Sequence, residues 1–159
     1  MGTKSDPLAK QFEAKAREAA AVLEKLSDAD WKKVTTAERW TVGVTAHHLA
    51  RAFEAVPGIV TALVAGRLPG NFSRVMLDEM NAQHARDNAN CTKTETIALF
   101  EKGVPTAAAV VRGLSDDQLA KSGAVFTDAP PMTAEQLVMG ALINHIDEHV
   151  GSIRKTIGK

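Results

Sequence analysis

The stretch Leu142–Ile153 reads LINHIDEHVGSI, and apolar residues and histidines recur along it every three or four positions. This spacing is typical of one face of an amphipathic helix. Thr133 followed by Gln136 forms a capping-box pattern, which marks a helix N-terminus. We therefore predict a final helix that begins after Thr133, runs to about Ile157 and turns one stripe toward the protein core. That stripe comprises Val138, Leu142, His145, His149 and Ile153.

A second helix is predicted upstream, roughly over Val42–Gly66, with Thr41 as its N-cap. Pro57-Gly58 falls inside this helix and is expected to kink it. Two neighbouring rows of the helix are expected to face the core. One row contains Val44, His48, Ala52, Ala55 and Ile59, and the other contains Leu49, Phe53, Val56, Val60 and Leu63.

Three further segments carry helical patterns. The first is expected to begin at Pro7 with Asp6 as its N-cap. The second is shorter and rich in polar residues. The third follows a capping box formed by Thr92 and Glu95, and we expect Pro105 to interrupt it. These segments span about 7–26, 75–88 and 93–112.

The fold class follows from these segments. No strand pattern competes with them, because Val125–Thr127 is too short to count as a sheet. Four long helices on short to medium connections predict an all-α four-helix bundle with an additional short helix. At 159 residues, the chain is expected to form one domain over 1–159.

Two of the connections resemble one another. Leu26–Trp31 reads LSDADW and Leu114–Leu119 reads LSDDQL, and both are expected to break the helical pattern. Each precedes a Thr-capped helix that carries an inward histidine. This weak echo has two readings, an ancient duplication or the common use of Ser-Asp at helix junctions.

Composition limits the partners and the compartment. Nineteen basic residues balance nineteen acidic ones, which argues against nucleic acid as a partner because binding phosphates needs a basic surplus. No apolar run approaches the length of about 18 residues that a membrane span needs. The N-terminus, MGTKSDPLAK, has no apolar signal-peptide core, and the single cysteine, Cys91, excludes an internal disulfide. We therefore expect a cytoplasmic protein in which Cys91 is an ordinary small residue.

The histidines are the candidate functional residues. His145 and His149 are four residues apart, so they share a helix face, and their apolar stripe is expected to turn both inward. Buried imidazoles need partners, and bundles build metal sites from inward side chains on facing helices. His48 lies on such an inward row, so we interpret His48, His145 and His149 as a three-histidine metal site. The alternative is a set of ordinary core or surface histidines, because one spacing of four also arises by chance.

The neighbouring polar residues receive other roles. His47 lies about 100° around the helix from His48, so the two cannot face the same ion. We therefore expect His47 to be solvated or at an interface. His84 lies in a polar stretch, QHARDN, and is expected to be exposed. Asp147 and Glu148 should point sideways, as surface groups or supports behind the ligands. Asn144 is a weaker candidate for lining the site.

Two of these segments resemble a known family. Trp40–Ala50, WTVGVTAHHLA, resembles the tryptophan-then-HLA segment of the DinB-like superfamily, and Leu142–Ile153 is similar to that family's final helix with its HxxxH motif. A less specific similarity over 80–100 extends the resemblance to most of the chain from about Phe12. It implies a four-helix bundle, often dimeric, that holds a divalent metal, zinc or nickel, with open water positions. The ligands would be His48, His145 and His149.

Some relatives are thiol-dependent enzymes, including the mycothiol-dependent maleylpyruvate isomerase, through its N-terminal domain, and bacillithiol-linked transferases. That isomerase subgroup has a further C-terminal domain and tends to carry Glu where this sequence has His145. The resemblance thus implies a metalloenzyme of this broader class, with a low-molecular-weight thiol or another small molecule as its substrate.

Three hypotheses follow. The first is a metal-dependent enzyme, a thiol-dependent S-transferase or a hydrolase, because three protein ligands leave coordination positions open. The second is a non-catalytic metal-binding or stress-related protein. The third is a metal-free dimeric interaction bundle, with Trp31, Trp40 and Pro57-Gly58 at its interface. A substrate-sized pocket at the open face of the metal distinguishes the first from the second.

Overall fold

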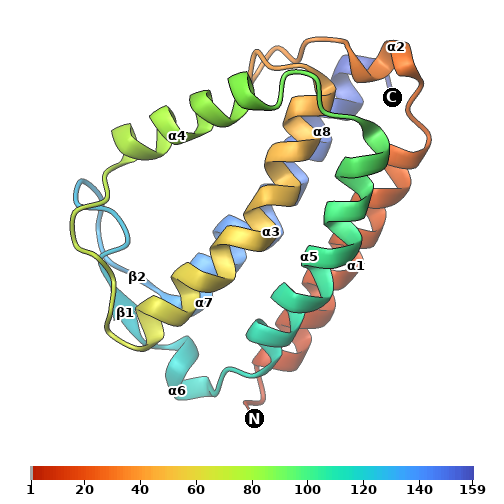
Figure 1. The fold of residues 1–159 in the computed structure, drawn as a ribbon. Helices are drawn as coiled ribbons and strands as arrows, with labels where there is room; N and C mark the ends of the chain where they lie inside the picture. The colour runs from red at the N-terminus through yellow and green to blue at the C-terminus, as the bar shows by residue number, and fades with distance from the viewer. Residues whose placement is uncertain (1) are drawn as a thin grey trace.

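A computed structural model describes residues 2–159 and shows a bundle of four long helical units. The last unit is composite, because a π-helical segment, η1, joins α7 to α8. The four units lie side by side, with α3 packed against both α5 and α8 (Figure 1). The predicted all-α bundle is confirmed. Its elements are α1 (Ser5–Glu24), α3 (Val42–Val64), α5 (Lys93–Arg112), α7 (Ala134–Val138), η1 (Met139–Asn144) and α8 (His145–Ile157).

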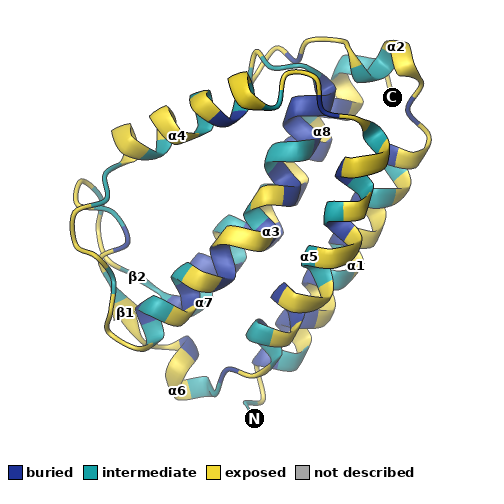
Figure 2. Cartoon of the chain, viewed as in Figure 1, coloured by how far each residue is buried: buried dark blue, intermediate teal, exposed yellow. Residues whose placement is uncertain are grey.

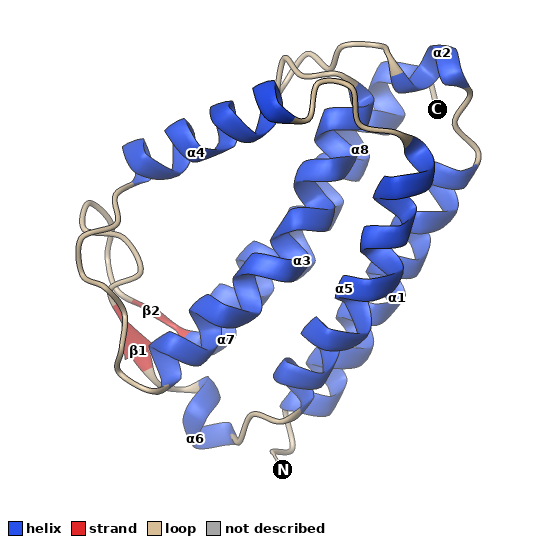
Figure 3. Ribbon diagram, viewed as in Figure 1, coloured by secondary structure: helices blue, strands red, loops and turns tan. Residues whose placement is uncertain are grey.

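Shorter elements lie in the connections between the four long units (Figure 3). The two LSD segments do not simply break the helical pattern, because Ser27 and Ser115 each form a capping box that opens a four-residue helix. A two-stranded antiparallel ladder was not predicted, since strands of two residues carry no alternation pattern. The shorter elements are α2 (Asp28–Trp31), α4 (Arg74–Asp87), α6 (Asp116–Leu119), β1 (Ser122–Gly123) and β2 (Met132–Thr133).

Most helix starts follow the predicted caps. The side chains of Thr41 and Thr92 accept hydrogen bonds from the first turns of α3 and α5. Asp6 is the exception: α1 starts at Ser5 without a side-chain cap, and the Asp6 carboxylate instead accepts a hydrogen bond from Nε of Arg112 at 2.8 Å. A competing ion pair with another helix therefore replaces the predicted capping role.

Pro57 and Pro105 both lie within continuous helices. α5 runs unbroken through Pro105, contrary to the predicted interruption. Pro105 is exposed, so the carbonyl that it leaves without a helical donor can bond to water. α3 likewise continues through Pro57 and ends at Val64, slightly before the predicted end at Gly66.

The core is packed around three phenylalanines. Phe53 of α3 makes edge-to-face contacts with Phe12 of α1 and Phe100 of α5, with ring centroids 5.2 and 5.0 Å apart. Such aromatic pairs add to the stabilisation that burial gives. Buried faces of the long helices are turned toward one another (Figure 2). No helix in the described part of the chain has the length and apolarity needed to cross a membrane.

Two features outside this regular packing shape the site. α4 diverges from the bundle axis and contacts mainly α3 (Figure 1). The final helix, predicted to be regular, contains the π segment η1 immediately before His145. A π turn accommodates an extra residue, and the apolar spacing along the sequence does not reveal it.

Candidate metal centre

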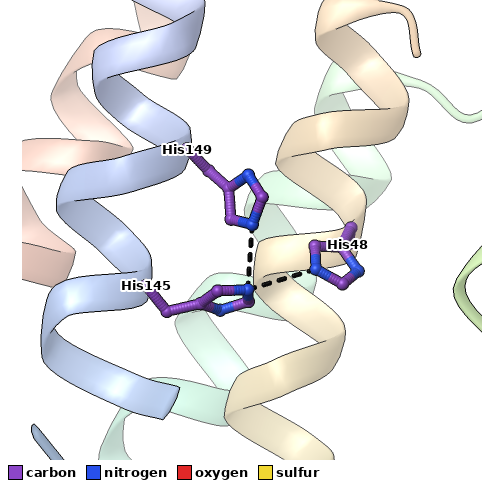
Figure 4. Close-up of side chains that lie close together, drawn as sticks. All are labelled: His48, His145 and His149. Atoms are coloured by element: carbon purple, nitrogen blue, oxygen red, sulfur yellow. Dashed lines mark hydrogen bonds between the residues drawn. The ribbon is translucent and has the colours of Figure 1, made fainter. Parts of the chain in front are cut away.

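The three predicted ligands converge between α3 and α8 (Figure 4). Nε2 of His145 lies 2.9 Å from Nε2 of His149 and 3.2 Å from Nε2 of His48. The ligand atoms of the three side chains all lie within 4.8 Å of one another. The structure therefore brings together the set that the sequence predicted.

Helix geometry explains how the three rings meet. His145 and His149 occupy successive turns of α8, and the π segment ends at the first of them. His48 reaches them from α3, whose first turn is fixed by Thr41. The ring of Trp40 lies against that of His48, with centroids 5.1 Å apart. Trp40 is thus part of the wall of the site and is half-buried.

Glu38 supports the cluster from a loop and was not identified from the sequence. Its Oε2 accepts a hydrogen bond from Nδ1 of His149 at 2.7 Å, and its Oε1 accepts one from Oγ of Ser152 at 2.5 Å. A carboxylate behind a ligand histidine fixes the tautomer and raises the basicity of the ligand nitrogen. No motif in the sequence marks this residue, because it is brought to the site by the loop fold.

The loop before α3 positions Glu38. The amide of Thr35 donates to the carbonyl of Trp40 at 2.8 Å, and Val34 forms a bridge with Thr41. Arg39 makes the tight turn with a φ of 63°, in the left-handed region. The side chain of Glu38 is 8% exposed. Burial acts to raise its pKa, but hydrogen bonds from Ser152, His149 and Thr35 outweigh burial and hold the pKa below its ordinary value.

The environment keeps two of the three candidate ligands neutral. Burial, together with the neighbouring histidines, lowers the pKa of His48 to about 3. Burial and the charge that His149 would carry lower the pKa of His145 to about 4. A metal ligand must present an unprotonated nitrogen, so both shifts favour metal binding at neutral pH.

The donor set fits a cation. Because His149 donates from Nδ1 to Glu38, its Nε2 presents a lone pair to the cluster. The Nε2 atoms of the three rings then meet. A proton on Nε2 of His145 would have to be shared between the Nε2 atoms of His48 and His149. Nδ1 of His145 is buried without a partner among the described residues. Zn–N bonds of about 2.0–2.1 Å would place ligand nitrogens about 3.3 Å apart, close to the 3.2 Å between Nε2 of His145 and Nε2 of His48.

The remaining histidines form a second pair. His84, predicted to be exposed, is 4% exposed and is the one buried residue of α4. Its Nε2 lies 2.7 Å from Nδ1 of His47, and the two rings stack. His47 is accordingly half-buried against α4 rather than solvated, which was the first of the two positions expected for it. Burial lowers the pKa of both, to about 4 for His84.

Other polar candidates lie outside the cluster. Asp147 and Glu148 are exposed, as predicted, and Asp147 pairs with Lys15 at 3.0 Å. Asn144 is also exposed and does not line the cavity described next. Cys91 is buried, and burial raises the pKa of its thiol, so it does not resemble a reactive thiolate.

A cavity of about 280 Å³ opens beside the cluster. His48 and His145 form part of its wall, and the other walls are mostly apolar side chains of α3, α4 and the 125–126 segment. A larger hollow of about 540 Å³ lies elsewhere, and none of the three histidines lines it. The smaller cavity is therefore the one placed to bring a molecule to the histidine cluster.

One of three comparisons with known proteins gave a match. The family model described as the mycothiol maleylpyruvate isomerase N-terminal domain matches residues 12–147, which include His48 and His145. His149 lies just beyond the matched range. Comparison with curated proteins returned no match, and comparison with solved structures returned none.

Proposed function

Because the chain belongs to the mycothiol maleylpyruvate isomerase N-terminal domain family, we propose that it is a cytoplasmic metal-dependent enzyme. His48, His145 and His149 would hold one divalent ion, zinc or nickel. The reaction would transfer a low-molecular-weight thiol to a small electrophilic molecule. The supporting observation is the convergence of three Nε2 atoms beside a cavity whose wall includes His48 and His145.

The chain itself supplies orientation and exclusion of water. Glu38 holds the proton of His149 on Nδ1, so that Nε2 faces the cluster. His48 and His145 face both the cluster and the cavity, whose mostly apolar walls offer few hydrogen-bond partners to competing water. A divalent ion bound there would lower the pKa of a coordinated thiol, so that a thiolate nucleophile is available at neutral pH.

The cavity favours an enzyme over a non-catalytic metal-binding or stress-related protein. A storage or structural site needs a closed ligand set, whereas three protein ligands leave positions open. The open side of this cluster adjoins a volume of about 280 Å³, close to the lower end of small-molecule sites.

The decisive measurement is the metal content of purified, untagged protein, with His48→Ala and His47→Ala as paired variants. We expect about one equivalent of divalent metal in the wild type and in His47→Ala, and loss of that metal in His48→Ala. His47 is a matched control because it lies beside His48 but bonds to His84 rather than to the cluster.

A metal-loaded protein would then be assayed for consumption of mycothiol, bacillithiol or glutathione with chlorodinitrobenzene and other electrophiles. Metal without thiol consumption would favour the non-catalytic hypothesis. No metal after reconstitution with zinc and nickel would leave the metal-free interaction bundle.

The homodimer remains a proposal that the family resemblance supports. Three exposed apolar residues of α4 are compatible with it: Val75, Met76 and Met80 are 62%, 41% and 52% exposed. Trp31 is less available for an interface, because its Nε1 donates to the carbonyl of Cys91 at 2.8 Å. Sedimentation equilibrium distinguishes a dimer from a monomer.

A further inference from the structure

A second cavity continues the first along α3. It has a volume of about 310 Å³ and shares Ala55, Ile59, Phe72 and Val125 with the cavity at the histidines. Together the two run beside α3 from His48 to Ala62, about 21 Å at 1.5 Å per residue. A small polar electrophile would leave most of this length empty.

The polar groups gather at the histidine end. Arg51 and Asn81 line the first cavity together with His48 and His145, whereas the second cavity is lined only by apolar residues and one glycine. Arg51 lies one helical turn from His48. Within residues 2–159 it forms no salt bridge or side-chain hydrogen bond, so its guanidinium is available to an anion.

The far end is open because α3 presents small residues there. Gly58 lies in the middle of a helix, where glycine costs about 1 kcal/mol relative to alanine. A Cβ built at Gly58 meets nothing within 4 Å. Close packing between helices therefore does not explain this glycine, and the second cavity lies over it.

We propose that the joined cavities bind an amphiphilic carboxylate, with its carboxylate against Arg51 and its alkyl chain along α3 over Ala55, Gly58 and Ala62. This inference rests on the proposed function, since it places the substrate head beside the histidine cluster, and it names the substrate class. The charge at one end and the apolar wall at the other carry it, because burying methylenes that would otherwise contact water lowers the free energy.

The test uses isothermal titration calorimetry on metal-free protein with butanoate, hexanoate and octanoate, and with octan-1-ol as the uncharged analogue. We expect each added methylene to lower Kd by up to about fourfold, and octanol to bind at least about tenfold more weakly than octanoate. A Kd that does not change with chain length would overturn the proposal.

Two variants locate the ends of the ligand. Arg51→Gln should remove the preference for octanoate over octanol, with Arg67→Gln, an exposed arginine outside both cavities, as its control. Gly58→Leu should weaken octanoate at least about tenfold while leaving butanoate almost unchanged. Gly151→Leu is its control, because that helical glycine also has open space around it but lines a separate hollow.

Circular dichroism and the melting temperature establish that each variant is folded. Octanoate binding by a folded Gly58→Leu protein with the wild-type Kd would also overturn the proposal. Because the titrations use metal-free protein, they are independent of metal content. Absence of metal in the wild type would defeat the proposed function and with it the role of the carboxylate as substrate, whereas absence of octanoate binding would defeat this inference alone.

Discussion

Nδ1 of His149 lies 2.7 Å from Oε2 of Glu38, and both side chains are less than one-tenth exposed, at 9% and 8%. The contact joins a loop residue to the final helix. Because the ring must donate from Nδ1 to the carboxylate, its other nitrogen is held as an acceptor toward His145. The orientation of the cluster thus depends on a residue that is not itself a ligand.

Glu38→Gln should weaken metal binding by about 10- to 100-fold. The amide oxygen can still accept from His149, but it lacks the charge that makes this hydrogen bond strong and the imidazole more basic. Competition between the protein and a chelator of known affinity measures the change. Glu148→Gln is the matched control, because Glu148 is exposed next to the same ligand. Equal affinities for the two variants would contradict a supporting role for Glu38.

Metal binding should also stabilise the fold. At free metal of about 100 times Kd, the gain is about 2.7 kcal/mol, which for a chain of this size raises the melting temperature by about 5–10 °C. Scanning calorimetry with and without chelator should show this difference in the wild type and not in His145→Ala. An equal effect of chelator on both proteins would mean that the ion binds elsewhere.

The metal-free protein should lose stability as the pH falls below about 6.5. The unfolded chain protonates His48 near its ordinary pKa of 6.5, whereas burial holds the folded pKa at about 3. The unfolded state therefore binds more protons between these values, and stability falls as pH falls through that window. From pH 7 to pH 5 this one group should cost about 2 kcal/mol.

Urea unfolding of chelated protein at pH 7 and pH 5 measures this loss, with His48→Gln as the reference. Carboxylates such as Glu38 contribute to acid sensitivity in both proteins, so the difference between the two pH dependences isolates His48. Because the pKa of His145 is lowered to about 4, part of the sensitivity should remain in the variant. Identical pH dependences would show that His48 is not buried as a neutral group.

The three candidate ligands could be predicted because each depends only on the spacing of residues within its own helix. His145 and His149 share a face by their separation of four, and His48 follows the apolar row of its own helix. Glu38 is not predictable in this way, since a loop with a left-handed residue brings it to the site. The prediction for His84 was wrong because a polar stretch hides the one buried position of α4. The π segment is not predictable either, because one extra residue barely changes the apolar pattern of a helix.

The π segment itself should set the register between α7 and α8. Residues before it, such as Val138, and after it, such as Ile146, are both buried. Deleting Gly140 would convert η1 toward an α-helix and rotate one side by about 100° relative to the other. The protein then either turns His145 away from His48 or exposes the apolar face of α7. We expect either the loss of metal binding or a fall in the melting temperature, with helix content retained.

Circular dichroism and metal analysis of the Gly140 deletion check this outcome. Gly140→Ala is the matched control, because Gly140 is exposed and a Cβ there meets nothing within 4 Å. Substitution keeps the extra residue, so it should preserve the metal and the melting temperature within a few degrees, whereas deletion removes the residue that the π turn accommodates. A deletion variant with wild-type metal content and stability would show that α7 and α8 tolerate either register, and that η1 does not position His145.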